Sequence, residues 1–260
     1  MNRIDAFFTQ GKKAFVPYIT AGFPNVEATL ENLKILVENG ADIIELGLPF
    51  SDPTADGPVI QTSSFKALEA GFKIDMYFDL IKQFRELYPE VPVVCFTYFN
   101  PVFHIGVDSF VKRLAEAGGD AMLVVDLPFE EQSELELPLE KEGLHLIPLI
   151  APTTGNDRKE KVLKEAGGFV YQIALKGVTG MRETVAEGVS EMVQETQTYT
   201  KLPVCLGFGV SSGDQAAAIA DTADGVVVGS ALVNCIDVNL PNYQDKFTSL
   251  VKELAEAIHA

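Results

Sequence analysis

The chain has 260 residues, of which 47% are hydrophobic and 22% charged, a composition typical of a folded globular protein and not of a disordered or collagen-like chain. Its 37 acidic and 20 basic residues give a net charge of −17, which disfavours binding to nucleic acid phosphates or anionic lipid headgroups. An anionic substrate would have to be met locally, by backbone N–H groups and helix N-termini.

The cysteines and the apolar segments bear on the cellular compartment. Cys95, Cys205 and Cys235 are widely spaced and form no CxxC pair, so we expect free thiols. The N-terminal residues lack the apolar run of a secretion signal. The longest stretch without charged residues, 91–107, contains two prolines and a histidine, which argues against a membrane span. We therefore expect a cytoplasmic protein.

Short apolar or β-branched runs recur along the whole chain and predict eight strands. In chain order they cover residues 14–20, 41–46, 91–99, 120–125, 144–150, 169–175, 202–208 and 224–229. Helical periodicity marks the segments between them, for example at residues 26–40, 107–119, 156–168 and 212–223. Continuous apolar strands alternating with amphipathic helices indicate parallel strands covered by helices.

Eight such units, each of about 30 residues, favour a single (β/α)8 TIM barrel that spans residues 1–260 as one catalytic domain. The alternative is an open Rossmann-like sheet. That fold commonly carries GxGxxG after its first strand, whereas this chain has Ala21-Gly22-Phe23-Pro24 there. In a barrel, the functional residues lie at the C-terminal ends of the strands and in the loops that follow.

Two acidic residues stand out near the end of the second strand. Glu45 interrupts an apolar run and is either a structural acid with a buried partner or a proton donor whose pKa is raised by burial. Asp56 lies in a long loop rich in proline and acid, where it either caps the next helix or takes part in catalysis. Asp52, in the same loop, is expected to close an Asx-turn.

Glycine-rich segments follow the last three strands, at residues 177–180, 207–212 and 229–230. Any one of them could be an ordinary turn. Together, with Ser230 opening a short helix, they predict a phosphate cradle after strands six to eight. Tyr98 and Tyr171 are read as core or rim residues of an aromatic pocket. His104 and His145 lack the spacing of metal ligands, so we expect no metal site.

The loop motifs resemble the signature of the tryptophan synthase alpha subunit family. The matching segments are residues 45–53 (ELGLPFSDP), 55–58 (ADGP), 98–101 (YFNP), 177–180 (GVTG), 207–211 (GFGVS) and 229–230 (GS). The resemblance extends along nearly the whole chain. It implies a lyase of tryptophan biosynthesis that cleaves indole-3-glycerol phosphate to indole and glyceraldehyde 3-phosphate by a retro-aldol reaction.

The resemblance also implies residue roles. Glu45 is similar to the acid that protonates C3 of the indole, Asp56 to the partner of the indole N–H, and Tyr171 to a tyrosine beside the acid. Thr179 lies in a loop that closes over the substrate in the family. The implied phosphate site comprises Gly180, Gly209, Gly229 and Ser230, and the implied indole pocket comprises Tyr18, Ile60, Phe96, Tyr98, Leu123 and Phe208.

Family resemblance implies that the chain needs no cofactor or metal of its own. It implies a partner, a tryptophan synthase beta subunit carrying pyridoxal phosphate (PLP), which receives indole in an α2β2 heterotetramer. Three alternatives stay open: a stand-alone indole-glycerol-phosphate lyase, another phosphate-binding barrel such as a sugar-phosphate aldolase or isomerase, and a non-catalytic barrel that binds a phosphorylated ligand and regulates a partner.

Overall fold

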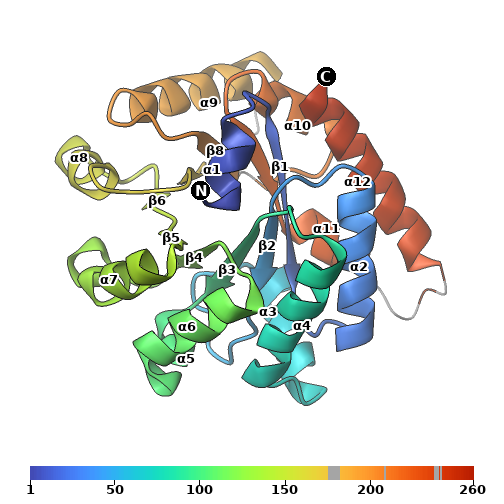
Figure 1. Cartoon of the computed structure of the whole chain (residues 1–260). Coiled ribbons are helices and arrows are strands. Elements are labelled where there is room, and N and C mark those ends of the chain that lie inside the picture. The colour runs from blue at the N-terminus through green and yellow to red at the C-terminus, as the bar shows by residue number, and fades with distance from the viewer. Residues whose placement is uncertain (175–181, 208, 237–239, 241) are drawn as a thin grey trace.

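A parallel sheet curled into a barrel forms the centre of the computed structural model, and helices surround it (Figure 1). The structure describes residues 1–174, 182–207, 209–236, 240 and 242–260. Within these ranges the strands are β1 (Ala14–Thr20), β2 (Ile44–Gly47), β3 (Val93–Thr97), β4 (Ala121–Val124), β5 (His145–Leu146), β6 (Leu149–Ile150), β7 (Val170–Ile173), β8 (Val204–Gly207) and β9 (Gly225–Val228). The predicted TIM barrel is therefore confirmed, and the open sheet is not the fold.

The fifth predicted strand, residues 144–150, is divided into two short strands. The sheet order runs β5-β4-β3-β2-β1-β9-β8-β7-β6. The two edge strands of the sheet are therefore β5 and β6, which follow one another in the chain. The Ile147 N–H donates to the Met122 carbonyl at 2.8 Å, and the Pro148 carbonyl accepts from the Tyr171 N–H at 2.9 Å. Pro148 has no N–H to donate to a ladder, and the strand is divided there. These bonds close the barrel between β4 and β7.

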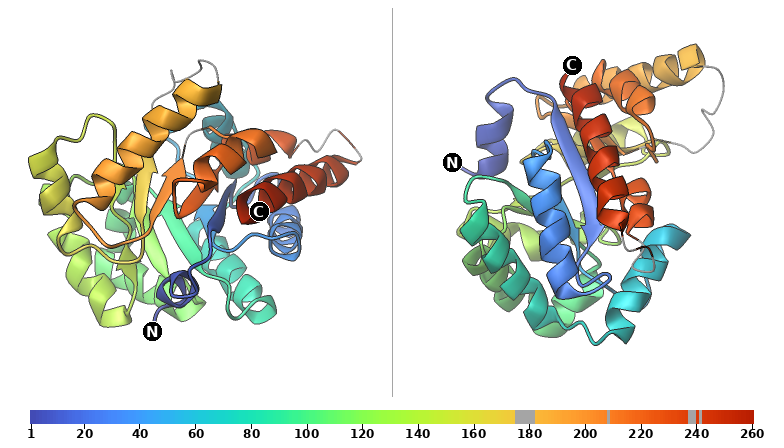
Figure 2. Two further views of the ribbon diagram at one scale, coloured as in Figure 1. Left: turned by 90° about the horizontal axis from the view of Figure 1, so that it is seen from above. Right: turned by 90° about the vertical axis from the view of Figure 1, so that its right-hand side faces the viewer.

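Helices cover the outer face of the sheet, except that α1 lies at the N-terminal end of the barrel interior. They are α1 (Arg3–Phe8), α2 (Val26–Glu38), α3 (Pro58–Glu69), α4 (Ile74–Leu87), α5 (Phe99–Ile105), α6 (Val107–Ala117), α7 (Ser133–Glu142), α8 (Asn156–Leu163), α9 (Arg182–Gln197), α10 (Gly213–Ala220), α11 (Ser230–Cys235) and α12 (Tyr243–His259), with a 3-10 turn at Phe129–Glu131. The C-terminal α12 packs against both α2 and α10 (Figure 2). Among the described residues, no helix is long and apolar enough to cross a membrane.

Local signals place the helix ends. Asn25 precedes α2, and its side-chain oxygen accepts from the Ala28 N–H at 2.8 Å, which satisfies one free donor of the first turn. Helix α6 ends where Gly118 adopts a left-handed conformation with φ of 94°, which a residue with a side chain rarely adopts. Helix α8 ends at Leu163, five residues before the end of the segment predicted to be helical.

The period-two alternation of the strands divides the apolar residues into two layers. Outward-facing side chains, such as Ile44 and Leu46, pack under the helices. The inward-facing side chains form an inner cluster that includes Ala14, Val16, Ile43, Val94, Ala121, Leu123, Ile147, Phe169, Cys205 and Val227. Helix α1 closes the N-terminal end of this cluster with Ile4, which is fully buried, and with Phe8, whose ring lies 6.1 Å from that of Phe169.

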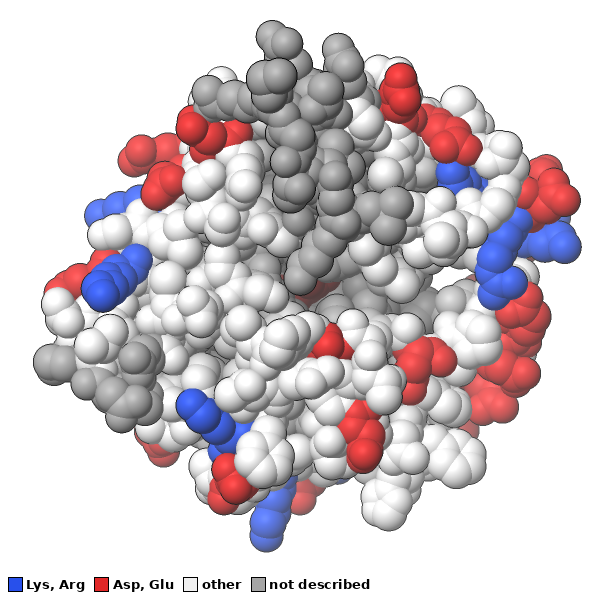
Figure 3. Space-filling view, turned by 180° about the vertical axis from the view of Figure 1, so that it is seen from behind, with Lys and Arg blue, Asp and Glu red and all other residues white. Residues whose placement is uncertain are grey.

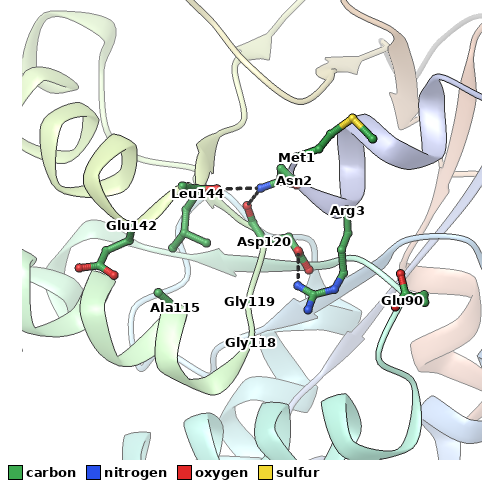
Figure 4. Close-up of a pocket in the computed structure, with 11 residues that line it drawn as sticks. Met1, Asn2, Arg3, Glu90, Ala115, Gly118, Gly119, Asp120, Glu142 and Leu144 are labelled. Atoms are coloured by element: carbon green, nitrogen blue, oxygen red, sulfur yellow. Dashed lines mark hydrogen bonds and ion pairs between the residues drawn. The ribbon is translucent and has the colours of Figure 1, made fainter.

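A buried carboxylate ties α1 to the N-terminal ends of the strands. Asp120 accepts from the guanidinium groups of Arg3 and Arg85, each at 2.9 Å, and from the Val93 N–H at 2.8 Å. This cluster lies at a cavity of about 560 Å³, in which the Arg3 side chain points toward Asp120 (Figure 4). Both carboxylate oxygens of Asp120 accept from donors on other elements, Arg3 on α1, Arg85 on α4 and Val93 on β3, so we infer that the cluster is a structural brace.

We predict that Asp120→Ala lowers the free energy of unfolding by about 3 kcal/mol, because it leaves two guanidinium groups and a buried N–H without their acceptor. Urea unfolding followed by circular dichroism measures the loss. Asp75→Ala is the control, because Asp75 also pairs with an arginine, Arg113, but its side chain is 75% exposed. It is expected to cost less than about 1 kcal/mol. Equal losses in the two variants would contradict the role of Asp120.

Candidate functional site

Glu45 lies on the inward face of β2 with its side chain fully buried. Neither carboxyl oxygen has a hydrogen-bond partner among the described residues. Burial raises the pKa of Glu45 to about 8, because a carboxylate without water or donors is poorly stabilised. The structural alternative required a buried partner, and the described part of the chain supplies none. Near neutral pH the group is a carboxylic acid that retains a proton to donate.

Tyr18 is the register partner of Glu45 on the neighbouring strand β1. Its ring packs edge-on against Phe96, with the ring centroids 5.1 Å apart. Its hydroxyl reaches across to β2 and occupies the space where a side chain at Gly47 would lie. Glycine at position 47 is therefore required for this close approach, which places the phenol oxygen two residues beyond Glu45 along β2.

The remaining described pocket residues lie around the same interior. Leu123 on β4 is fully buried within the inner cluster. Tyr171 on β7 leans over β8, where a Cβ at Gly207 would lie 2.7 Å from its hydroxyl oxygen. Burial, with Glu45 and Asp56 nearby, raises the pKa of Tyr171 well above its ordinary value. Ile60 is a partly buried residue of α3.

Asp56 is held at the mouth of the barrel by a tyrosine. The Tyr98 hydroxyl donates to Asp56 Oδ2 at 3.0 Å and accepts from the Ala55 N–H at 3.0 Å. Phe50 packs against the Tyr98 ring with centroids 5.1 Å apart. Gly57, not Asp56, precedes α3, and no side chain caps that helix, so the capping interpretation of Asp56 is wrong. Burial raises the pKa of Asp56 to about 6, although the bond from Tyr98 acts in the opposite direction.

The described part of the predicted phosphate cradle consists of backbone after β8 and β9. Gly209 has φ of 71°, and a Cβ there would meet nothing within 4 Å, so its backbone is open to approach. Gly229 precedes α11, which begins at Ser230. Gly180, Thr179 and Phe208 lie outside the described residues, and their predicted roles stay predictions.

Figure 3 shows the face opposite to that of Figure 1, on which the described lysine and arginine side chains in view lie toward the rim. Uncharged side chains predominate around its centre, with some acidic ones between them. On the described surface, a phosphate near the centre would therefore depend on backbone N–H groups. Among the described residues, no group of three or more His, Cys, Asp and Glu could hold a metal ion.

Several residues of the site had no predicted role. Phe50 belongs to the loop motif and packs against Tyr98. Gly47 makes room for Tyr18, and Gly207, which was predicted only as part of the phosphate cradle, makes room for Tyr171. Two buried hydroxyl groups, Thr20 on β1 and Ser63 on α3, lie 2.6 Å apart. They are separated by 43 residues in the chain. No sequence pattern signals such a pair, because its two members belong to different elements.

The comparisons with known proteins agree on one family. The family described as "Tryptophan synthase alpha chain" matches residues 5–259. The chain is 45% identical to the tryptophan synthase alpha chain of Carboxydothermus hydrogenoformans, over 95% of this chain and 93% of that protein. It is 46% identical to the tryptophan synthase alpha chain of Methanosarcina barkeri, over 94% of this chain and 91% of that protein. The crystal structure of tryptophan synthase subunit alpha from Legionella pneumophila superposes with a TM-score of 0.86 at 36% identity, covering 99% of this chain and 98% of that one.

We predict that Tyr98→Phe raises the pKa of Asp56 above its value of about 6. The phenol donates to the carboxylate and stabilises the ionised form, so its loss favours the protonated form by about half a unit to one unit. Carboxyl ¹³C chemical shifts followed through a pH titration measure the change. Tyr88→Phe is the matched control, because the Tyr88 hydroxyl donates to Glu38, which has no contact with the site. An unchanged or lower pKa of Asp56 would contradict the prediction.

Proposed function

The chain belongs to the tryptophan synthase alpha chain family, and from that premise we propose that it cleaves indole-3-glycerol phosphate to indole and glyceraldehyde 3-phosphate. The observation that carries the proposal is Glu45, a fully buried acid without a described hydrogen-bond partner in an aromatic barrel interior. A second acid, Asp56, lies at the mouth and has a lower pKa. Together they supply one proton donor and one anionic acceptor.

In the proposed reaction, Glu45 donates its proton to C3 of the indole ring, which creates an indolenine cation. The bond between C3 and the glycerol carbon then breaks, and its electron pair returns to the ring. The hydroxyl on that carbon becomes the aldehyde and gives its proton to the Glu45 carboxylate, which restores the acid. Protons and charge therefore balance over the cycle without an external reagent.

Asp56 is proposed to accept a hydrogen bond from the indole N–H. Positive charge develops on that nitrogen only after C3 is protonated, so a carboxylate there stabilises the transition state more than the substrate. The two pKa values, about 6 for Asp56 and about 8 for Glu45, suit these roles. At pH values between these two pKa values, Asp56 is ionised and Glu45 is protonated. Tyr171 is proposed to line the site beside Glu45.

The substrate's two ends are proposed to bind in different surroundings. The indole would lie among Tyr18, Ile60, Phe96, Tyr98, Leu123 and Phe208. The phosphate would bind at Gly180, Gly209, Gly229 and Ser230, with Thr179 in a loop that closes over it. The inward position of Phe96 and Leu123 and the open backbone at Gly209 support this arrangement.

We propose that residues 1–260 act as one catalytic domain, since the sheet extends without interruption from β1 to β9. Carboxyl groups and backbone donors suffice for the chemistry, so the chain is proposed to need no cofactor of its own. Cys95 and Cys205 are buried free thiols, which supports a reducing, cytoplasmic compartment.

The proposed partner is a tryptophan synthase beta subunit, which would carry PLP and receive indole in an α2β2 heterotetramer. Family membership supports this partner. A second support is Phe103 on α5, a large apolar side chain that is 67% exposed in the helix directly after β3. Exposed aromatic side chains of this kind are enriched at protein interfaces.

We predict that Glu45→Gln reduces indole release by about 10³-fold or more, because glutamine keeps the shape of the acid but has no proton to transfer. The dissociation constant of a phosphate-containing indole analogue should change by no more than about threefold. Indole fluorescence reports both release and binding, since the chain contains no tryptophan. Retained turnover would remove Glu45 from the mechanism.

Two loop variants complete this experiment. Asp56→Asn is expected to lower turnover by about 10²-fold, since an amide does not neutralise the indolenine cation. Asp52→Asn is its matched control, because Asp52 is an exposed acid of the same loop whose carboxylate accepts from the Ser51 hydroxyl at 2.6 Å. It is expected to retain near-normal turnover. Equal losses in both variants would assign the effect to the loop and not to the Asp56 charge.

A further prediction concerns the partner. Adding a purified tryptophan synthase beta subunit should accelerate indole release by at least about tenfold, because docking would order the site for closure. Steady-state rates with and without the partner measure the effect. Fast release that the partner does not change would indicate a stand-alone lyase. Binding without release in either case would indicate the regulatory barrel.

A further inference from the structure

A chain of three hydroxyl groups runs from the barrel interior to α3. Tyr18 and Thr20 lie on the same face of β1, and Ser63 lies on α3, directly after the loop that carries Asp56. All three residues are at least 96% buried. The Tyr18 and Thr20 hydroxyl oxygens are 3.4 Å apart, and those of Thr20 and Ser63 are 2.6 Å apart.

The direction of each hydrogen bond follows from counting protons. Ser63 donates its single hydroxyl proton to the Ile60 carbonyl at 2.8 Å, so it can only accept from Thr20. Thr20 then has no proton left and accepts from Tyr18. The protons therefore all point from β1 toward α3, and the Tyr18 oxygen offers only lone pairs to its other neighbours.

One of these neighbours is Glu45 on β2, whose Cα is the register partner of the Tyr18 Cα. The Tyr18 hydroxyl occupies the side-chain space of Gly47, two residues beyond Glu45 on the same inward face. The Glu45 oxygens have no described hydrogen-bond partner, so the Tyr18 oxygen acts on them across a gap, where its lone pairs disfavour a carboxylate more than the neutral acid. The direction of the hydroxyl chain thus bears on the protonation state of Glu45.

We propose that the Ser63–Thr20–Tyr18 hydroxyl chain turns the Tyr18 proton away from Glu45 and thereby holds Glu45 in its protonated form. In this arrangement Tyr18 is a positioning residue for the acid, and Thr20 and Ser63 act through Tyr18. The inference deepens the proposed function, because it concerns the same proton donor.

Other titratable groups also face Glu45. They are Tyr171 from β7 and Cys205 from β8, with Asp56 at the mouth near Tyr18. Burial raises the pKa values of Tyr171 and Cys205, so both are neutral near pH 7. Asp56 is the remaining charged neighbour among the described residues. A test of the hydroxyl chain must therefore follow Asp56 as well as Glu45.

Ser63→Ala tests the proposal without altering a residue assigned to catalysis or binding. Without Ser63 as acceptor, the Thr20 proton is free to bond the Tyr18 oxygen, and the Tyr18 proton is then free to turn toward Glu45. A phenol dipole whose positive end turns toward Glu45 stabilises the carboxylate across the gap, so the pKa of Glu45 should fall by about half a unit.

The readout is a pH titration of the carboxyl ¹³C shifts, in which Glu45→Gln assigns the Glu45 signal. The alkaline limb of kcat/KM should move to lower pH by the same amount, because the acid is lost earlier. Ser64→Ala is the matched control, since Ser64 is the next residue of the same helix and is also buried. In Ser64→Ala, Glu45 should titrate as it does in the unmodified protein.

Further variants separate this role from a merely structural one. Thr20→Val should shift the Glu45 titration in the same direction as Ser63→Ala, whereas Thr20→Ser keeps the hydroxyl and should restore the normal titration. In a Tyr18→Phe background, Ser63→Ala should add no shift, because no phenol proton remains to be redirected. A shift that persists in that background would overturn the proposal.

The outcomes also distinguish this inference from the proposed function. Normal Glu45 titrations in both Ser63→Ala and Thr20→Val would overturn the hydroxyl chain. Shifted ¹³C titrations with an unmoved kcat/KM profile would support the chain and would instead overturn Glu45 as the proton donor. Circular dichroism establishes whether each variant is folded. If Ser63→Ala does not fold, the nearly isosteric Thr20→Val decides whether the hydroxyl chain controls the Glu45 titration.

Discussion

The burial of one carboxyl group within the barrel is the constraint on which the site depends. A charged Glu45 would lack both water and a described donor, so the neutral acid is the stable form near neutral pH. The residues around it preserve this condition. Tyr18 and Phe96 fill the neighbouring space, and the inner cluster below them excludes water. The apolar interior thus keeps the proton on Glu45 as well as stabilising the fold.

Two glycines make this crowded interior possible. Tyr18 lies over Gly47 and Tyr171 lies over Gly207, so each large phenol occupies space that a strand side chain would otherwise fill. Asp56 is in a contrasting environment, because it is only partly buried and accepts a hydrogen bond from Tyr98. Two carboxyl groups in one site therefore acquire different pKa values from different surroundings.

The two ends of the barrel have separate tasks. At the N-terminal end, α1 and the Asp120 ion pairs close the inner cluster and brace the strands. At the C-terminal end, loops carry Asp56 and the glycines of the proposed cradle. Rigid strands hold Glu45 while the loops approach it from one side only.

Local sequence patterns determined the repeated strand and helix units, the position of Glu45 within an apolar strand and the glycine-rich loops, because periodicity and turn chemistry act over a few residues. The inward face of Glu45 was decided by the barrel, because both faces of that strand are apolar. The division of residues 144–150 depends on hydrogen bonding with distant segments, at Met122 and Tyr171. The Tyr98–Asp56 bond joins residues 42 apart and the Thr20–Ser63 bond residues 43 apart. Only the closed barrel decided these contacts, since register and closure bring side chains from separate elements within bonding distance.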